Sequence, residues 1–308
     1  MIEVKNISMS YGKKEVLKDI SFQIGDGEVI GLLGENGAGK STTMNILTGY
    51  LKPNGGEVLI EEVDMMKHPI EAKKKIGYLP EVPPLYKDMK VVEYLEYAAR
   101  LKKRKDVSQE VKRVMDLFDL YENRLQVIKH LSKGWQQRVG FAGSLIGNPP
   151  FLILDEPLVG LDPSESKKVR ELIKELSKDH TIMISSHILK EIEELCTGIL
   201  ILKNGTIAFH DSMEKARHGN KNTYKLVVKG EKDKIMLLLT NSDLLQKVEF
   251  VKEQEESVYE FLVEAKQSKD IRDSLLGLLV GKKFSVYGVE RFEQSLEDMF
   301  LTMNKEEK

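Results

Sequence analysis

Residues 34–42, which read Gly34-Glu35-Asn36-Gly37-Ala38-Gly39-Lys40-Ser41-Thr42, decide the fold of this chain of 308 residues. They fit the pattern G-x-x-x-x-G-K-[ST], which is typical of a loop that binds nucleotide phosphates. Backbone N–H groups of such a loop point at the phosphates, and the N-terminus of the following helix adds a positive pole. We therefore predict that Lys40 reaches the β- and γ-phosphates and that the Ser41 hydroxyl binds Mg²⁺. The other residues expected to hold the nucleotide in this loop are Gly34, Asn36, Gly37, Ala38, Gly39 and Thr42.

The segments on either side of this loop have the patterns that such a site requires. Residues 28–33 (EVIGLL) form a near-continuous apolar run, which predicts a strand that is buried on both faces. Residues 40–50 read as a helix, which Pro53 and the Gly55-Gly56 pair bring to an end. The loop is therefore predicted to join a buried strand to the N-terminus of a helix.

A second apolar run ends in two adjacent carboxylates. Residues 151–154 (FLIL) predict another buried strand, and Asp155 and Glu156 follow it directly. Beside a phosphate loop, Asp155 is expected to hold Mg²⁺ directly or through water. Glu156 is then expected to act as the general base that polarises the attacking water.

Strand and helix patterns alternate through much of the chain. Residues 91–127 have apolar residues at helical spacing with no strand signal between them, which predicts a helical insert. After the acidic strand come a predicted helix at 164–176, a strand at 181–185 and a helix after His187. This alternation predicts a parallel α/β sheet with crossover helices.

The pattern changes after a polar segment at residues 217–222. Residues 224–289 read as strand, helix, two alternating strands, helix and strand, which is the ferredoxin-like order β-α-β-β-α-β. A last helix is predicted to begin at Ser295, with Asp298 completing a capping box. Its predicted apolar face consists of Leu296, Met299, Phe300 and Met303.

The composition excludes several classes of protein. Apolar residues make up 41% and charged residues 31%, a balance typical of a globular protein, and the net charge of −2 argues against a general nucleic-acid binder. One cysteine, Cys196, allows neither a disulfide within the chain nor a cysteine zinc site. No segment reaches the ~18 apolar residues that a membrane span needs. We therefore expect a cytoplasmic protein that relies on another chain for any membrane crossing.

The segment between the two phosphate-site motifs is more specific. Residues 131–138 (LSKGWQQR) resemble the LSGGQ signature of ATP-binding cassette (ABC) proteins, and they lie shortly before the acidic strand, as in that family. Four further pieces resemble that family in order. They are Tyr11 as the adenine-stacking aromatic, residues 76–81 (IGYLPE) as the Q-loop region, residues 159–162 (VGLD) as the D-loop, and His187 as the switch histidine.

The resemblance, which covers residues 1–215, implies the fold and the domain organisation. The expected fold is α/β: a P-loop nucleotide-binding cassette with a RecA-like parallel sheet core, an antiparallel β-subdomain and a helical subdomain at about residues 85–145. A linker at 216–222 would lead to a small α+β, ferredoxin-like C-terminal domain at 223–308, with a helix at its end.

The resemblance also implies the chemistry and the partners. Two nucleotide-binding subunits, expected to be two copies of this chain, would close head to tail around two ATP molecules. Ser132 and Gly134 of one subunit would contact the γ-phosphate that the other subunit's loop holds, while His187 would contact the γ-phosphate in its own site. The implied role is an ATPase that powers a separate integral membrane permease from the inner face of the cell membrane.

Three positions depart from the family pattern. Glu81 stands where the Q-loop has glutamine, and we expect its carboxylate to meet Mg²⁺. Lys133 and Trp135 replace a glycine and the glutamine of the signature. Such variants resemble the branch of multidrug, bacitracin and sodium exporters with separately encoded permeases. Two alternatives are a non-transport ABC ATPase that acts on ribosomes or nucleic acid and a regulatory subunit that does not hydrolyse ATP.

Overall fold

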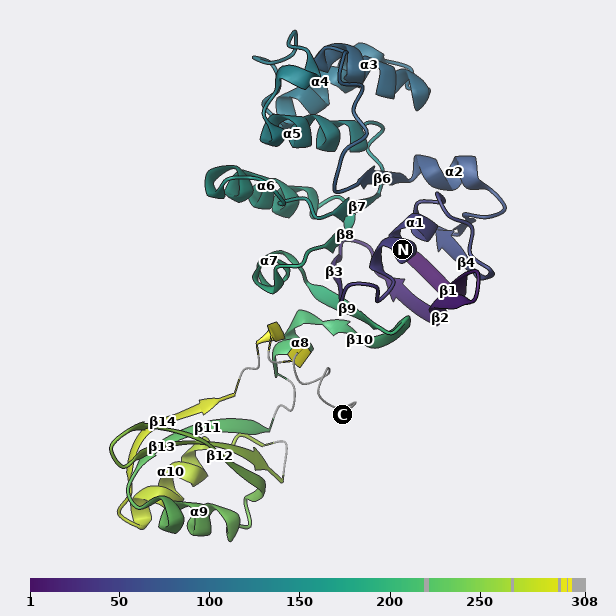
Figure 1. Ribbon diagram of the computed structural model, residues 1–308. Coiled ribbons are helices and arrows are strands. Elements are labelled where there is room, and N and C mark those ends of the chain that lie inside the picture. The colour runs from purple at the N-terminus through teal and green to yellow at the C-terminus, as the bar shows by residue number, and fades with distance from the viewer. Residues whose placement is uncertain (219–221, 267–268, 293–294, 298, 301–308) are drawn as a thin grey trace. The chain divides into compact units, whose positions relative to one another are not determined.

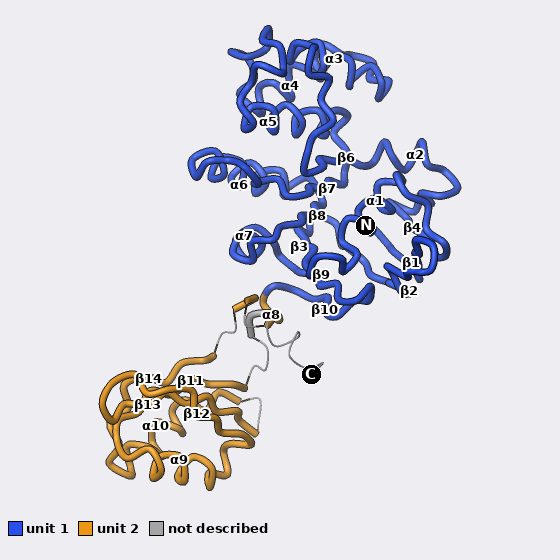
Figure 2. Tube along the Cα trace, viewed as in Figure 1, with its two compact units in different colours: residues 1–213 blue, residues 214–308 orange. Residues whose placement is uncertain are grey.

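The computed structural model describes residues 1–218, 222–266, 269–292, 295–297 and 299–300. The chain divides into two compact units, Met1–Met213 and Glu214–Lys308, which Figure 2 shows in blue and orange. In the part of the chain that is described, no helix is long and apolar enough to cross a membrane.

The first unit is built on a six-stranded sheet whose order is β10-β9-β3-β8-β7-β6 (Figure 1). Its strands are β3 (Val29–Gly34), β6 (Ile76–Leu79), β7 (Phe151–Asp155), β8 (Thr181–Ser185), β9 (Gly198–Lys203) and β10 (Thr206–Ser212). Five of them run parallel and β10 is antiparallel to β9. In β7 and β8 nearly every residue is buried, which explains their continuous apolar sequences. The carboxyl ends of β3, β7 and β8 therefore meet at one edge.

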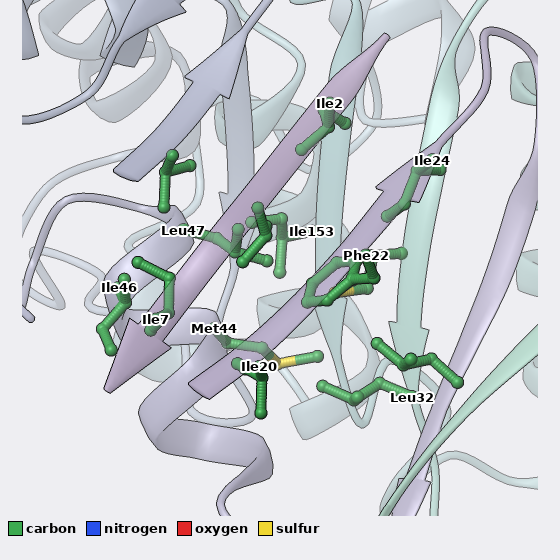
Figure 3. Packing of buried hydrophobic residues seen from close by; sticks show 14 of the residues in the cluster. Ile2, Ile7, Ile20, Phe22, Ile24, Leu32, Met44, Ile46, Leu47 and Ile153 are labelled. Atoms are coloured by element: carbon green, nitrogen blue, oxygen red, sulfur yellow. The ribbon is translucent and has the colours of Figure 1, made fainter. Parts of the chain in front are cut away.

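A second, antiparallel sheet and one helix complete the core of this unit. The sheet consists of β1 (Ile2–Tyr11), β2 (Lys14–Ile24), β4 (Gly55–Ile60) and β5 (Val63–Asp64) in the order β2-β1-β4-β5. Figure 3 shows Phe22 of β2, Met44 of α1 (Lys40–Leu47) and Ile153 of β7 in one apolar cluster. Each such side chain contributes about 1.5–3 kcal/mol when fully buried. Helix α1 is shorter than predicted because Gly49 adopts a left-handed backbone (φ 65°), which ends the helix.

The predicted helical insert is confirmed. Residues 91–127 contain α3 (Val91–Leu101) and α4 (Val107–Leu117), and the short 3₁₀ helix η1 (Ile128–His130) and α5 (Lys133–Ser144) extend the helical region to residue 144. Nζ of Lys102 donates to the carbonyl oxygens of Ser144 (3.2 Å) and Ile146 (2.6 Å), which caps the C-terminal end of α5. The remaining helices of the first unit are α2 (Pro69–Lys74), α6 (Pro163–Leu176) and α7 (Leu189–Leu195).

The second unit has the predicted ferredoxin-like order. Its elements are β11 (Thr223–Lys229), α9 (Lys232–Thr240), β12 (Leu245–Glu255), β13 (Val258–Ala265), α10 (Arg272–Gly281) and β14 (Ser285–Arg291). The four strands form an antiparallel sheet in the order β12-β13-β11-β14. Leu226 and Phe261 of the sheet share one apolar cluster with Ile235 of α9 and Leu275 of α10.

The structure differs from the prediction at the start of the linker, and the last predicted helix is described only in part. Helix α8 (Met213–His218) occupies the start of the predicted linker 216–222, because this stretch is rich in residues that favour helices. Residues 296–297 and 299–300 are helical, and Leu296 is buried. Asp298, which we predicted to complete a capping box, and Met303, which we predicted on the apolar face of the last helix, lie outside the described residues.

Candidate nucleotide-binding site

The glycines of the phosphate loop are required by its backbone. Gly34, Gly37 and Gly39 have φ values of 151°, 86° and 111°, a region that other residues rarely adopt. A Cβ on Gly34 would lie 2.4 Å from the carbonyl oxygen of Leu202, and a Cβ on Gly39 would lie 2.5 Å from Cδ2 of Leu17. The loop can therefore present backbone N–H groups, rather than side chains, to an anion.

Lys40, the first residue of α1, folds back over this loop. Its Nζ donates to the carbonyl oxygen of Gly34 (2.6 Å) and to that of Glu35 (3.2 Å). Burial lowers the pKa of Lys40, whereas the carboxylates of Glu156 and Asp155 act in the opposite direction. The ammonium group is thus held beside the loop and within electrostatic reach of both carboxylates. Ser41 and Thr42 follow it in the first turn of α1, where Ser41 is exposed.

The two carboxylates stand at the carboxyl end of β7. Asp155 pairs in register with Ser185, the last residue of the neighbouring parallel strand β8. The Ser185 hydroxyl donates to Oδ1 of Asp155 at 2.5 Å. Sequence reasoning missed Ser185, although its position at the end of a predicted strand was a usable signal.

Glu156 lies close to His187 and is largely buried. Oε2 of Glu156 is 2.9 Å from Nδ1 of His187, and the exposed fraction of its side chain is 15%, against 66% for His187. Burial raises the pKa of Glu156, His187 opposes that effect, and Asp155 and Glu81 add to it. The pairing brings together the two residues that we predicted to act as base and switch, and a carboxylate so placed can accept a proton from a water molecule.

Tyr78 is a further residue at this edge that the sequence did not single out as functional. It lies in β6, opposite Ile153 of β7, and is half-buried. Burial, together with the Asp155 carboxylate, raises the pKa of Tyr78 to about 12. Its phenol therefore stays neutral and can donate a hydrogen bond at physiological pH.

The donor atoms at this edge suit Mg²⁺. Hydroxyl and carboxylate oxygens, as in Ser41 and Asp155, are the hard ligands that this ion prefers. Within the described ranges, no group of three or more His, Cys, Asp or Glu side chains could hold a metal ion by itself. A cation here would therefore take further ligands from phosphate and water, as Mg²⁺ usually does.

Tyr11 and Glu81 lie on exposed parts of the first unit. Tyr11 is the last residue of β1, pairs with Lys14 across a turn, and is 52% exposed. Glu81 is exposed just beyond β6, and its charge reaches Glu156. The structure thus brings Glu81 into the electrostatic environment of the carboxylates and leaves the Tyr11 ring open to solvent.

The signature segment forms the start of α5, in the helical insert. Ser132 is the N-cap, and its hydroxyl accepts from the Trp135 N–H at 3.4 Å. The guanidinium of Arg138 stacks on the Trp135 ring (4.8 Å) and donates to Glu165 of α6. Figure 1 shows α5 and α1 in different parts of the first unit. The N-terminus of α5, whose backbone N–H groups could attract an anion, is separate from the phosphate loop of the same chain.

Comparison with known proteins places these features in one family. The model of the ABC transporter family matches residues 17–159. The chain is 33% identical to an uncharacterized ABC transporter ATP-binding protein of Bacillus subtilis, YhcH, over 100% of this chain and 97% of YhcH. It is 36% identical to the lantibiotic transport ATP-binding protein SrtF of Streptococcus pyogenes, over 73% of this chain and 95% of SrtF.

A solved structure resembles the first unit. It is a dimeric, post-hydrolysis state of the ATP-binding cassette MJ0796 bound to ADP and Pi, with 26% identity and a TM-score of 0.64. The match covers 69% of this chain and 99% of that cassette. The predicted nucleotide-binding cassette fold is thereby confirmed.

Proposed function

Since this chain belongs to the ATP-binding proteins of ABC transporters and is an ATPase, we propose that it works as a head-to-tail dimer that drives a separately encoded exporter. This proposal is supported by the arrangement of residues at the carboxyl edge of the parallel sheet. There the phosphate loop, Asp155, Glu156 and His187 meet, with His187 Nδ1 2.9 Å from the Glu156 carboxylate. A subunit that only bound nucleotide would not need a buried carboxylate paired with histidine.

The residues of one chain perform the first part of the reaction. The loop N–H groups and Lys40 bind the β- and γ-phosphates of ATP, while Ser41 and Asp155 would hold Mg²⁺, with Glu81 nearby. Mg²⁺, when bound, neutralises charge that develops on the phosphates. Glu156 accepts a proton from the attacking water, and His187 orients Glu156 and contacts the γ-phosphate.

The second subunit supplies the rest of the site. Ser132 and Gly134 stand at the exposed start of α5, whose N-terminal N–H groups favour an anion. A Cβ on Gly134 would meet its nearest neighbour, Leu161, at 3.5 Å, so packing within this chain does not require glycine. Close approach of the partner's γ-phosphate explains the glycine instead. The dimeric MJ0796 structure supports this arrangement.

A groove on the first unit suits a helix of the permease. Its volume is about 340 Å³, and aromatic and proline side chains line it, among them Tyr50, Tyr78, Pro83, Pro84 and Tyr94. Tyr50 is 84% exposed, and Val82 nearby in sequence is 78% exposed. We infer that a cytoplasmic helix of the permease docks here, next to Glu81. The chain would then act at the inner face of the membrane, and transport by the relative SrtF supports the role.

Affinity capture tests the transporter role. The Glu156→Gln chain should hold ATP in a closed dimer, so it is captured with ATP from detergent-solubilised cells and its partners are identified by mass spectrometry. The Lys40→Ala chain is the control, because it should not close. We expect Glu156→Gln to capture a membrane protein with several spans in a fixed ratio to this chain. Lys40→Ala should not capture it. Ribosomal proteins or nucleic acid without such a partner would overturn the transporter role in favour of a non-transport ATPase.

A further inference from the structure

Ser185 contacts both residues of the carboxylate pair, Asp155 and Glu156. Strands β7 and β8 are neighbours in the parallel sheet (Figure 1), and Asp155 and Ser185 face each other in register. Ser185 is 2% exposed. A hydroxyl in such a place must satisfy its hydrogen bonds within the protein, because a buried polar group without a partner destabilises the folded state.

The hydroxyl of Ser185 serves both carboxylate residues at once. It donates its proton to Oδ1 of Asp155 at 2.5 Å. Its oxygen accepts from the backbone N–H of Glu156 at 3.0 Å. The proton of the hydroxyl is thereby directed to one residue and a lone pair to the next, which couples the side chain of Asp155 to the backbone of Glu156.

The backbone of Glu156 needs such support. Its φ is 50°, in the left-handed region, which is unfavourable for a residue with a Cβ because that atom approaches the following carbonyl oxygen. The carbonyl oxygen of Ser185 also accepts from the same N–H, at 3.2 Å, so Ser185 holds this N–H with two acceptors. This turn places the Glu156 side chain against His187.

We propose that Ser185 is a positioning residue that orients Asp155 toward the metal and holds Glu156 in its strained, productive turn. The inference rests on the proposed roles of Asp155 and Glu156 and adds the residue through which the two are coupled. Alanine at 185 would remove both the donor and the acceptor. Threonine would keep both, and cysteine would keep the volume with weaker hydrogen bonds.

The neighbouring residue provides a matched control. Ser186 is also buried, at 3% exposure, but its hydroxyl donates to Glu191 and accepts from the N–H of Ile188. Ser186→Ala therefore deletes a buried, hydrogen-bonded hydroxyl that does not contact the two carboxylates. Thermal melts followed by the fluorescence of Trp135, the single tryptophan, establish that each variant is folded.

The experiment measures turnover and metal binding separately. ATPase assays at saturating ATP give kcat, and electron paramagnetic resonance of Mn²⁺ with protein and ADP gives the metal affinity. We expect Ser185→Ala to lower both kcat and Mn²⁺ affinity by about 10- to 100-fold, the usual effect of losing a residue that orients a metal ligand. Ser185→Thr should restore both, Ser185→Cys should fall between, and Ser186→Ala should match the wild type.

The outcomes separate this inference from the proposed function. Glu156→Gln is assayed in parallel. If it loses hydrolysis while Ser185→Ala keeps both kcat and Mn²⁺ affinity, the positioning role is overturned and the base assignment stands. Equal losses in Ser186→Ala and Ser185→Ala would also overturn it, because any buried serine would then suffice. If Glu156→Gln still hydrolyses ATP, the assignment of Glu156 as the base fails. If Mn²⁺ affinity is unchanged in Ser185→Ala, the proposal that Ser185 positions Asp155 fails as well.

Discussion

Nδ1 of His187 lies 2.9 Å from Oε2 of Glu156, although 31 positions separate the two residues. The carboxylate is largely buried and the imidazole is largely exposed. The histidine can therefore orient the carboxylate from the solvent side, where a nucleotide would enter. This relationship makes the two residues a unit whose function can be tested by substitution.

Glu156→Gln should leave ATP affinity intact and lower hydrolysis by about 10²- to 10⁴-fold, because the amide keeps the volume of the side chain but cannot accept the proton of water. ATP affinity from a fluorescent analogue and phosphate release at saturating ATP provide the measurement. Glu171→Gln, an exposed substitution on α6, is the control and should keep the wild-type rate. Full hydrolysis by Glu156→Gln would remove this residue from its role.

A double-mutant cycle should reveal that Glu156 and His187 act together. His187→Ala alone should lower kcat with little change in ATP affinity. Residues that act as a unit have non-additive effects, so the double variant Glu156→Gln/His187→Ala should be hardly slower than Glu156→Gln alone. Phosphate release by the three variants is compared. Multiplicative losses would show that the two residues work independently, despite the contact between them.

Lys40→Ala should abolish tight ATP binding, because the substitution removes the counter-charge of the β- and γ-phosphates. The half-buried ammonium also donates to the loop carbonyls of Gly34 and Glu35, so the loop itself should become less ordered. Titration with a fluorescent ATP analogue measures the affinity. Lys167→Ala, which changes an exposed lysine on α6, should bind as the wild type does. Unchanged affinity in Lys40→Ala would contradict the assignment of the phosphate loop.

Mixing two inactive variants tests whether the signature acts in trans. Gly134→Asp should fold, since its Cβ has room, but its carboxylate should repel the partner's γ-phosphate. Lys40→Ala and Gly134→Asp should each be inactive as homodimers. A mixed dimer has one complete site, so an equal mixture should recover roughly a quarter of the wild-type rate if subunits pair at random.

The control for the Gly134→Asp substitution is Gly134→Ala, which adds a methyl group without a charge. Gly134→Ala should lose less activity than Gly134→Asp. Each purified variant is assayed at the total protein concentration of the mixture. No recovery at any mixing ratio, with both variants folded, would argue against a head-to-tail dimer.

Lys102 should make the stability of the first unit depend on pH. Burial lowers the pKa of Lys102 to about 8 from its ordinary value of 10.5, so between these values the unfolded chain binds a proton that the folded chain does not. Stability relative to Lys102→Met should therefore be constant below pH 8. It should rise by about 2 kcal/mol between pH 8 and pH 9.5, since each pH unit contributes about 1.4 kcal/mol.

Urea unfolding followed by Trp135 fluorescence measures this difference, because Trp135 lies on α5, the helix that Lys102 caps. Lys112→Met, an exposed substitution on α4, serves as the control and should show no such rise relative to the wild type. A stability difference that stays constant between pH 8 and pH 9.5 would mean that the Lys102 amine stays charged in the folded state.

Much of the fold was accessible from local patterns. The phosphate loop, the strand that ends at Asp155 and the order of the C-terminal elements depend on hydrophobic periodicity and on glycines within a few residues, which a sequence displays directly. The end of α1 was predicted too late, since the left-handed backbone of Gly49 ends the helix before Pro53 and the Gly55-Gly56 pair are reached. Asp155 as candidate metal ligand and Glu156 as candidate base were accessible for the same local reason, because carboxylates that end an apolar run are conspicuous in a sequence.

The sequence by itself determined the class of fold, the phosphate loop and the identity of the charged residues at the site. Only the tertiary structure decided which of them touch. Strand β8 lies between β3 and β7 in the sheet, although β7 precedes β8 in the chain, and the register of β7 on β8 sets Ser185 against Asp155. The burial that gives Lys102 and Tyr78 unusual pKa values likewise comes from packing between distant segments, because desolvation depends on the surrounding atoms and not on neighbours in sequence.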